Sequence, residues 1–355
     1  MSEKGTVAVW VELSGENLPL AERELQACAS VLDPASSPPR PLPWGGERFR
    51  EVTFSRPGPE GLLARRLALA HRVLRPLAEG SLDTLVEAMV MEGGSGATAR
   101  VRVASGAPQP LAREAPRLLG HAFLQGGGRV DLGSPDRDFV VLLPAASASP
   151  PSATEAGLAE LLGEVPRDEM DSRRSKHRPY RKPVTLSPLL ARSLVNLAGA
   201  PLGGSILDPF CGTGAILLEA AFLGYRVSGA DRAAEMIRGT LQNLRAEKVE
   251  PDRLVQCEVQ ELLSQLEGER FDAAVFDPPY GRASGTGGRA SSEVLLQAVE
   301  ALPGLLRPHG RATCLVSDPS SLPPMPRGLS LESTILGERV HRSLTRWVVT
   351  LRRDL

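Results

Sequence analysis

The second half of the chain alternates between apolar stretches typical of strands and amphipathic stretches typical of helices. Strands are predicted at residues 205–210, 225–231, 254–259, 271–277 and 311–317, and helices at 187–198, 213–223 and 233–246. Strands connected through helices pair in parallel and need helices on both faces of their sheet. Two further strands near 329–337 and 345–352, with little helix between them, predict an antiparallel hairpin at one edge. Residues 183–355 are therefore expected to form an α/β domain with a seven-stranded, mostly parallel sheet.

The first half of the chain mixes short strands and helices, which predicts one or two small α+β units. The expected strands are 7–13, 48–54, 99–103, 129–132 and 139–143, and the expected helices are 19–30, 61–74 and 112–124. A stretch rich in Pro, Ser and Ala at 144–153 predicts an interdomain linker. The predicted domains are residues 1–75, 76–150 and 183–355, with 151–182 as a linker.

Composition narrows the classes of protein to consider. The formal net charge of −1 over 355 residues argues against a protein that coats nucleic acid by bulk charge. No apolar run approaches the ~20 residues that span a bilayer, and the first residues lack a secretion signal, so a cytoplasmic protein is expected. The four cysteines are far apart and form no CxxC pair, so neither a disulfide framework nor a metal site is expected.

A glycine-containing turn lies where the first strand of the parallel sheet passes into a helix. Residues 208–214 read DPFCGTG, and their glycines allow a tight turn and close approach of the backbone to a ligand. The third glycine of the dinucleotide fingerprint is missing, and Asp208 stands at the strand end instead. An acid suits a ligand with positive charge and an amino-acid head group, as in S-adenosylmethionine. We predict that this cofactor contacts Asp208, Phe210, Cys211, Gly212, Thr213 and Gly214.

Acidic residues also end the next two predicted strands. Asp231 follows the glycine turn by roughly 20 residues, the position from which an acid accepts hydrogen bonds from ribose hydroxyls. Glu258 ends the third strand and is the candidate for the adenine amino group, with Glu261 competing for that role.

The fourth strand and the loop after it read FDAAVFDPPYG. Ligands of an open α/β sheet bind at the carboxyl ends of its strands, so Asp277 is expected in the same crevice as the glycine turn. An aromatic amine is a poor nucleophile unless both its N–H groups donate hydrogen bonds, and Asp277 and the carbonyl of Pro278 can accept them. Pro279 stiffens the loop, and Tyr280 offers a ring to stack on a base swung out of its helix. The predicted reaction is methyl transfer to an exocyclic amino group, with these four residues catalytic.

Four segments of the second half resemble the archaeal and eukaryotic tRNA (guanine-N2) methyltransferases that act at guanosine 10. These segments are RPYRKPV with SPLLARSLVNL (178–197), DPFCGTG (208–214), DPPYGR (277–282) and HRSLTR (341–346). The resemblance implies a class I, Rossmann-like methyltransferase fold. It also implies transfer to N2 of a tRNA guanosine, at position 10, with the base flipped into the Asp-Pro-Pro-Tyr pocket.

The first half resembles the same family more loosely. ARVRV (99–103) and VDLGSPD with FVV (130–141) are similar to a THUMP domain, an RNA-binding module, and residues 1–75 would then be the ferredoxin-like domain before it. The implied partner is tRNA, and eukaryotic relatives also use a small zinc-binding subunit as an activator. We expect the chain itself to be a monomer. Deletion of residues 1–150 is expected to remove RNA affinity and spare the cofactor site.

A run of basic residues lies between the two halves. It holds Arg173, Arg174, Lys176, His177, Arg178, Arg181 and Lys182. These six arginines and lysines are predicted to contact RNA phosphates, the alternative being a solvated linker. Arg282, after the catalytic loop, is predicted to contact RNA as well. His341, Arg342 and Arg346 are either RNA contacts or an ordinary polar strand end.

Three other functions remain open from the sequence. One is a methyltransferase acting on rRNA guanine or on an amino group of DNA. Another is an RNA-binding protein with an inactive methyltransferase domain, against which Asp208, Gly212, Gly214, Asp231 and Asp277 argue. A third is a protein-glutamine methyltransferase, although such enzymes usually present Asn where Asp277 stands.

Overall fold

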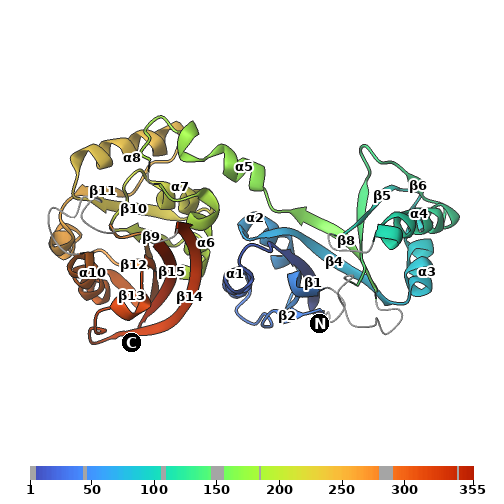
Figure 1. Ribbon diagram of the computed structural model, residues 1–355, viewed down its shortest axis with the longest axis horizontal. Helices are drawn as coiled ribbons and strands as arrows, with labels where there is room; N and C mark the ends of the chain where they lie inside the picture. Colours follow the sequence, from blue (N-terminus) through green and yellow to red (C-terminus); the bar gives the residue numbers. More distant parts are fainter. Residues whose placement is uncertain are drawn as a thin grey trace. The chain divides into compact units, whose positions relative to one another are not determined.

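The computed structural model describes residues 5–42, 46–104, 109–144, 156–183, 185–279, 291–341 and 344–355, which form two compact units. The first unit consists of residues 1–18, 33–65 and 70–165, and the second of residues 19–32, 66–69 and 166–355. Figure 1 shows the elements of each. Two short N-terminal segments thus belong to the unit that the second half of the chain forms.

The first unit is built on one sheet, which has eight strands within the described residues. Its order is β2-β3-β1-β4-β8-β7-β5-β6. The strands are β1 (Val7–Leu13), β2 (Arg40–Pro41), β3 (Phe49–Phe54), β4 (Ala70–Gly80), β5 (Thr98–Val103), β6 (Arg129–Val130), β7 (Arg137–Leu142) and β8 (Ala156–Glu164). Helices α3 (Leu82–Glu92) and α4 (Gln109–Gln125) share a buried core with β5, β7 and β8. The ranges predicted as ferredoxin-like and THUMP-like therefore share a sheet, joined through β4 and β8.

The predicted helix over residues 61–74 is wrong in its second half. Helix α2 (Pro59–Arg66) ends at Arg66, and strand β4 begins at Ala70. The buried carboxylate of Glu24 accepts hydrogen bonds from the backbone N–H of Ala68 and of Leu69, at 3.0 and 2.8 Å. These amides cannot also continue a helix, and Glu24 lies more than 40 residues earlier in the chain, out of reach of any local pattern.

The segment predicted as a linker over residues 151–182 begins, where the structure describes it, with strand β8. This strand pairs antiparallel with β4 on one side and β7 on the other. Neighbours on both sides and a covering core bury its first four residues, 156–159, so the alternation expected of a half-exposed strand is missing. Helix α5 (Arg167–Ser172) and the short helix η3 (Ser175–His177) follow in the second unit.

The second unit contains a sheet of seven strands among the described residues, ordered β11-β10-β9-β12-β13-β15-β14. The first five run parallel, and β15 runs antiparallel to both its neighbours. The predicted parallel sheet with a C-terminal antiparallel hairpin is confirmed. Its strands are β9 (Ser205–Asp208), β10 (Arg226–Asp231), β11 (Arg253–Gln256), β12 (Phe271–Phe276), β13 (Leu306–Val316), β14 (Leu329–His341) and β15 (Leu344–Arg353).

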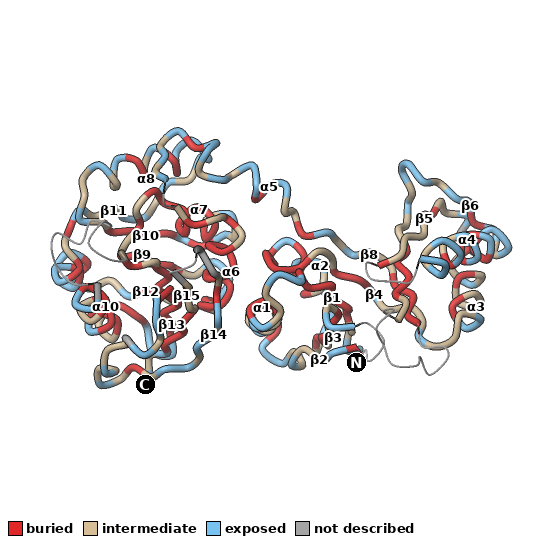
Figure 2. Tube along the Cα trace, viewed as in Figure 1, coloured by how far each residue is buried: buried red, intermediate tan, exposed pale blue. Residues whose placement is uncertain are grey.

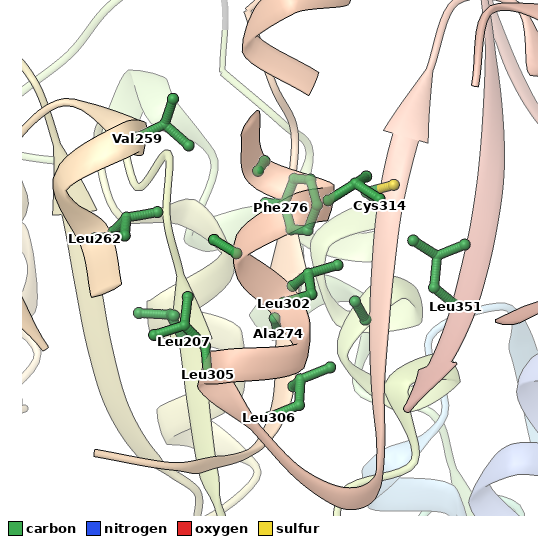
Figure 3. Packing of buried hydrophobic residues seen from close by; sticks show 14 of the residues in the cluster. Leu207, Val259, Leu262, Ala274, Phe276, Leu302, Leu305, Leu306, Cys314 and Leu351 are labelled. Carbon is green, nitrogen blue, oxygen red and sulfur yellow. The ribbon is translucent and has the colours of Figure 1, made fainter. Parts of the chain in front are cut away.

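Helices cover both faces of this sheet. On one face, α9 (Leu262–Gln265) and α10 (Ser291–Leu305) pack on a buried cluster that includes Leu207, Phe276 and Leu302 (Figure 3). Because neighbouring strand residues point to opposite faces, Ile206 and Val275 face the other side. Helices α6 (Pro188–Ala198), α7 (Ala215–Phe222) and α8 (Ala234–Ala246) pack there. Figure 2 shows the central strands β9, β10, β12 and β13 buried along most of their length. Each fully buried leucine contributes about 1.5–3 kcal/mol, so the sheet is a firm platform for the loops at its edge.

Helix α1 (Leu18–Leu32) is tied into the second unit by buried polar groups. Besides the two amides above, Glu24 accepts a hydrogen bond from the side-chain amide of Asn196 on α6, at 2.7 Å. Asn196 also donates to the carbonyl of Arg66, at 2.9 Å. The Arg66 guanidinium donates to the hydroxyl of Tyr225, at 2.7 Å. The N-terminal segments are thus part of the interior of this unit. No helix among the described residues has the length and apolar character needed to cross a membrane.

This network changes the outcome expected from truncation. A fragment of residues 166–355 loses α1 and leaves the buried side chains of Asn196 and Tyr225 short of partners. Each such loss costs about 1–3 kcal/mol, and the apolar face under α1 becomes exposed as well. We expect the fragment to unfold at least about 5 °C below the second unit in the full chain, as measured by calorimetry.

A chain lacking only residues 1–16 keeps α1 and serves as the control, with the corresponding transition expected to be unchanged. If the 166–355 fragment is as stable as the second unit in the full chain, α1 does not have the role inferred here.

Candidate active site

Strands β9 and β12 place two acids at one edge of the sheet. The strands pair in parallel, with Leu207 opposite Ala274, so their carboxyl ends emerge side by side. Asp208 ends β9 and Asp277 follows β12 directly. The rings of Phe210 and Phe276 meet across the two loops, with centroids 5.7 Å apart. The structure thus brings together the two segments in which the sequence predicts cofactor binding and catalysis.

Asp208 is buried at this edge, with 1% of its surface exposed. Its Oδ1 accepts a hydrogen bond from the backbone N–H of Phe210, at 3.0 Å. Burial raises the pKa of Asp208 well above its ordinary value, and the negative charges of Asp231 and Asp277 raise it further. Three carboxyl groups therefore gather at the strand ends, an arrangement that a cationic ligand would stabilise.

The turn after β9 has a backbone that only glycine adopts without strain. Gly212 and Gly214 have φ of +52° and +81°. Asp231, at the end of β10, accepts hydrogen bonds from the N–H of Gly212 at 3.1 Å and of Ala233 at 2.9 Å. Burial raises its pKa. Each carboxylate oxygen can accept a second hydrogen bond, so Asp231 both orders the turn and can still accept from a ligand.

Cys211 and Thr213 support the turn from inside. The backbone N–H of Cys211 donates to the carbonyl of Ala230, at 2.9 Å, and its buried thiol has a pKa raised well above the ordinary value, mainly by desolvation. A thiol in that state is not a nucleophile. The Thr213 hydroxyl lies 3.4 Å from that of Thr185.

Helix α8 holds the turn through residues that the sequence analysis did not select. The hydroxyl of Thr240 donates to the carbonyl of Gly212, at 2.7 Å. The amide of Asn243 donates to the carbonyls of Thr213 and Tyr180, at 2.9 and 3.0 Å, and accepts from the N–H of Tyr180, at 2.9 Å. Polar residues three apart on the buried face of a helix are the signal that could have identified them.

Tyr180 from the RPYRKP segment packs directly on α8. A Cβ atom at Gly239 would lie 2.1 Å from the Tyr180 ring, so this position needs glycine. The hydroxyl of Tyr180 and the ammonium of Lys182 both donate to the carboxylate of Glu235, each at 2.8 Å. The segment is therefore a structural clamp beside the glycine turn.

Glu258 lies just beyond β11 and caps the short helix η4 (Val259–Glu261). Its side chain accepts from the N–H of Glu261, and the Glu261 carboxylate accepts from the N–H of Glu258, at 3.0 Å. The Arg232 guanidinium lies 3.7 Å from the Glu258 carboxylate. Both acids considered for the adenine contact are thus used in local capping, and that contact stays a prediction.

The catalytic segment is described as far as Pro279. Pro278 is buried and Pro279 is half-buried, while Tyr280 and Arg282 lie outside the described residues. Beside Asp277 lies Arg346 of β15, whose Nη2 is 3.6 Å from Oδ2 of the aspartate. Arg346 is 6% exposed, so its side chain faces the interior rather than a solvent-facing RNA surface. The sequence contained no local signal for this pair, because the two residues lie almost 70 positions apart.

Part of the basic run is committed to the interior of the second unit. Arg173 pairs with both carboxylate oxygens of Glu219, at 2.9 and 3.1 Å, and Arg192 pairs with the same fully buried group. Arg178 is 7% exposed and donates through Nε to the carbonyl of Arg173, at 2.8 Å. Arg173 thus holds the segment against α7, and Arg178 binds back to the backbone of the segment itself, so neither guanidinium is presented to a phosphate.

The remaining basic residues of the run differ in whether the structure shows an acidic side chain beside them. Arg174 pairs with Asp171 at 2.8 Å, and Lys182 with Glu235 as described. Lys176 and Arg181 are exposed. Of the predicted RNA contacts that the structure describes, these two are the exposed cations for which it shows no acidic partner.

Comparisons with known proteins agree with this geometry. A family model described as an RMKL-like methyltransferase domain matches residues 175–346. The tRNA (guanine(10)-N2)-dimethyltransferase of Methanothermobacter thermautotrophicus is 30% identical over 305 residues, covering 82% of this chain and 85% of that protein. This chain belongs to the tRNA (guanine(10)-N2)-dimethyltransferase family. The family predicted from the sequence is confirmed, and with it the assignment as a methyltransferase.

Solved structures support the fold. TrmN from Thermus thermophilus aligns with a TM-score of 0.55 at 22% identity, over 98% of this chain and 99% of that one. SMU.472, solved in complex with SAH, aligns with a TM-score of 0.53 at 12% identity, over 99% of this chain and 98% of that one. At these identities the likeness is one of fold, and it confirms the class I methyltransferase architecture.

The clamp of Tyr180 on α8 can be tested with Gly239→Ala. The added Cβ overlaps the ring, so we expect a loss of about 1–3 kcal/mol in the free energy of unfolding. In a Tyr180→Ala background the overlap is gone, and the same change should be neutral or stabilising because alanine favours helix by about 1 kcal/mol. Urea unfolding of the wild type, the two single variants and the double variant gives the change in unfolding free energy caused by Gly239→Ala with and without the Tyr180 ring. An equal change in the two backgrounds would contradict the clamp.

Proposed function

We propose that this protein transfers methyl groups from S-adenosylmethionine to N2 of a guanosine in tRNA, with position 10 as the target. The observation that carries the proposal is the placement of Asp277 beside the glycine turn, at the carboxyl edge of a methyltransferase sheet. Family membership supports the substrate, since the relative from Methanothermobacter thermautotrophicus is named for guanosine 10 of tRNA.

The residues of the turn fit the cofactor. Asp208 is buried and Asp231 half-buried, and desolvation raises the pKa of both, so a ligand with a sulfonium and an ammonium group would favour their charged forms. The likeness in fold to SMU.472, which was solved with SAH, is in keeping with this. The proposed cofactor contacts are Asp208, Phe210, Cys211, Gly212, Thr213, Gly214, Asp231 and Glu258.

The catalytic loop supplies acceptors for the target amine. When bound, S-adenosylmethionine supplies an electrophilic methyl group, which the amine nitrogen takes with its lone pair as the carbon–sulfur bond breaks and one N–H proton is released. The Asp277 carboxylate accepts a hydrogen bond from one N–H and the Pro278 carbonyl from the other, which localises the lone pair on nitrogen. Asp277 is also placed to take the released proton. Hydrogen-bond acceptors that the end of a buried strand already holds in position need little reorganisation when the reaction takes place.

The base must leave its helix to reach this loop. We propose that it is flipped into the Asp-Pro-Pro-Tyr pocket, where the Tyr280 ring stacks on it and Pro279 stiffens the wall. Base flipping puts the exocyclic amine, rather than a backbone atom, within reach of Asp277.

Asp277→Ala should lower the rate of methyl transfer at least about 100-fold, because the target amine loses its acceptor. The dissociation constant for S-adenosylmethionine should change less than about threefold. The contrasting variant is Asp231→Ala, which removes a hydrogen-bond acceptor for the cofactor. It should weaken cofactor binding about tenfold or more, because that factor corresponds to the free energy of one hydrogen bond to a charged group. Calorimetry gives the affinities, and methyl incorporation into tRNA gives the rate. If Asp277→Ala loses cofactor affinity and rate equally, Asp277 does not have the proposed catalytic role. If Asp231→Ala keeps its cofactor affinity, Asp231 does not bind the cofactor.

The product identifies the reaction. Mass spectrometry of nucleosides from tRNA treated with the protein and labelled cofactor should show label in N2-methylguanosine or N2,N2-dimethylguanosine. Label in an adenosine or in rRNA alone would overturn the substrate, and no label in any nucleic acid would overturn the activity.

We propose that RNA reaches the site past Lys176 and Arg181, and that the THUMP-like part of the first unit binds tRNA. Both residues are exposed beside the clamp that borders the glycine turn. Arg282 and the other cations of the run stay proposed RNA contacts. Arg173 and Arg178 would have to leave their present partners to contact RNA. The chain is proposed to act as a monomer in the cytoplasm, with a small activating subunit as a second partner. Its four free, buried cysteines fit a reducing compartment.

The double variant Lys176→Ala/Arg181→Ala should weaken tRNA binding and lower the slope of log K against log[salt] by about 2, because each phosphate contact contributes about one. Cofactor affinity should not change. Arg226→Ala is the matched control, because Arg226 is an exposed arginine outside the proposed RNA contacts and pairs with Asp252 at 2.8 Å; it should leave the slope within about 0.5 of the wild type. A slope unchanged in the double variant would contradict the proposed RNA path.

A further inference from the structure

A buried arginine stands beside the proposed catalytic aspartate. Arg346 lies on β15, and its Nη2 reaches to 3.6 Å from Oδ2 of Asp277. Its side chain is 8% exposed and that of Asp277 is 20% exposed, so water screens this pair poorly. Resting on the function proposed above, we propose that Arg346 is a positioning residue for Asp277: it holds the carboxylate in place and keeps it ionised.

The arginine is itself held by a second acid. Its Nη1 donates to the carboxylate of Glu338 on β14, at 2.7 Å. Glu338 and Arg346 are direct partners across the β14–β15 ladder. With one nitrogen on Glu338 and the other on Asp277, the planar guanidinium has a fixed direction in the interior.

A bulge in β14 sets this register. The ladder shifts between Leu336 and Glu338, so that Glu338 comes opposite Arg346. A Cβ at Gly337 would lie 2.9 Å from the carbonyl oxygen of Arg346, closer than real contacts allow. Glycine therefore permits the bulge at this point, and bulges of this kind re-aim side chains beside functional sites. The contact with Asp277 is thus built into the sheet.

The acidic surroundings of Asp277 favour a cation beside it. Asp208 on β9 lies close enough that the negative charge of Asp277 raises its pKa, and Asp231 adds to the same effect. Cys314, opposite Phe276 on β13, is fully buried, and burial and Asp277 together raise its pKa to about 12, so it remains neutral. Glu338 on β14 is acidic and engaged by Arg346. Arg346 is a cation that the described part of the chain places beside Asp277.

Ionisation decides what Asp277 can do. An ionised carboxylate only accepts hydrogen bonds, as the N–H groups of the target amine require, whereas a protonated one also donates and cannot take a proton. An opposite charge within about 4–6 Å lowers a carboxyl pKa by roughly 1–3 units. Since activity needs the ionised form, it is present above that pKa and lost below it. Removing the cation moves the acidic limit of activity to higher pH.

The test is Arg346→Met, which keeps much of the side-chain volume and removes the charge. The pH profile of kcat should shift its acidic limb upward by about 1–3 units, with kcat at neutral pH falling while KM for tRNA and cofactor affinity change less than about threefold. Arg346→Lys, which restores the charge, should bring the limb back to within about half a unit. Arg311→Met is the matched control, because Arg311 pairs with Glu332 at 2.6 and 3.0 Å in the same sheet and should leave the limb unmoved.

A second readout does not depend on activity. Carboxyl carbon-13 NMR follows the titration of Asp277, whose signal is assigned by its loss in Asp277→Asn. Its titration should move to higher pH in Arg346→Met and not in Arg311→Met. An unmoved Asp277 titration, or a fall in kcat with no shift of the pH profile, overturns the inference. A wild-type protein that methylates no RNA overturns the proposed function instead, and the NMR titration then still decides whether Arg346 controls Asp277.

Discussion

The parallel pairing of β9 with β12 is the constraint on which the candidate site depends. Parallel strands send their carboxyl ends to one edge, and here both strand ends carry an acid. The ring of Phe210, in the loop after β9, contacts the ring of Phe276 at the end of β12. Helices on both faces bury the strands, which lowers the freedom of the loops that leave them. Replacing either acid would change the chemistry of the edge without changing the sheet.

Gathering the buried Asp208 and the half-buried Asp231 and Asp277 at one edge has an electrostatic cost, and the fold offsets it in two ways. Backbone N–H groups of Phe210, Gly212 and Ala233 donate to Asp208 and Asp231, and Arg346 reaches Asp277 from the antiparallel hairpin. The hairpin that closes the sheet thus does more than cover an edge. A cationic cofactor would supply the remaining compensation, which links cofactor binding to the charge state of the site.

Several arginines of this protein serve its interior, with Arg66, Arg178, Arg192 and Arg346 buried. In the run between the two halves, Arg173 anchors the segment to α7 through Glu219, and the buried Arg178 donates to the backbone carbonyl of Arg173. Lys182 and Tyr180 fix the same segment to α8, next to the glycine turn. A cluster that is strongly basic in sequence therefore leaves Lys176 and Arg181 as its open cations among the described residues. Charge counted along a chain overstates the charge available to a ligand.

The sequence by itself determined the sheet of the second unit, the glycine turn and the acids at its strand ends. These features depend on local periodicity and on residues that follow their strands directly, as Asp208 and Asp277 do. Contacts between distant segments could not be predicted this way. Glu24 ends helix α2 and ties α1 to Asn196, Asn243 joins Tyr180 to the turn, and Arg346 meets Asp277. Each joins residues far apart in the chain, and only the folded arrangement of strands and helices decides which of them meet.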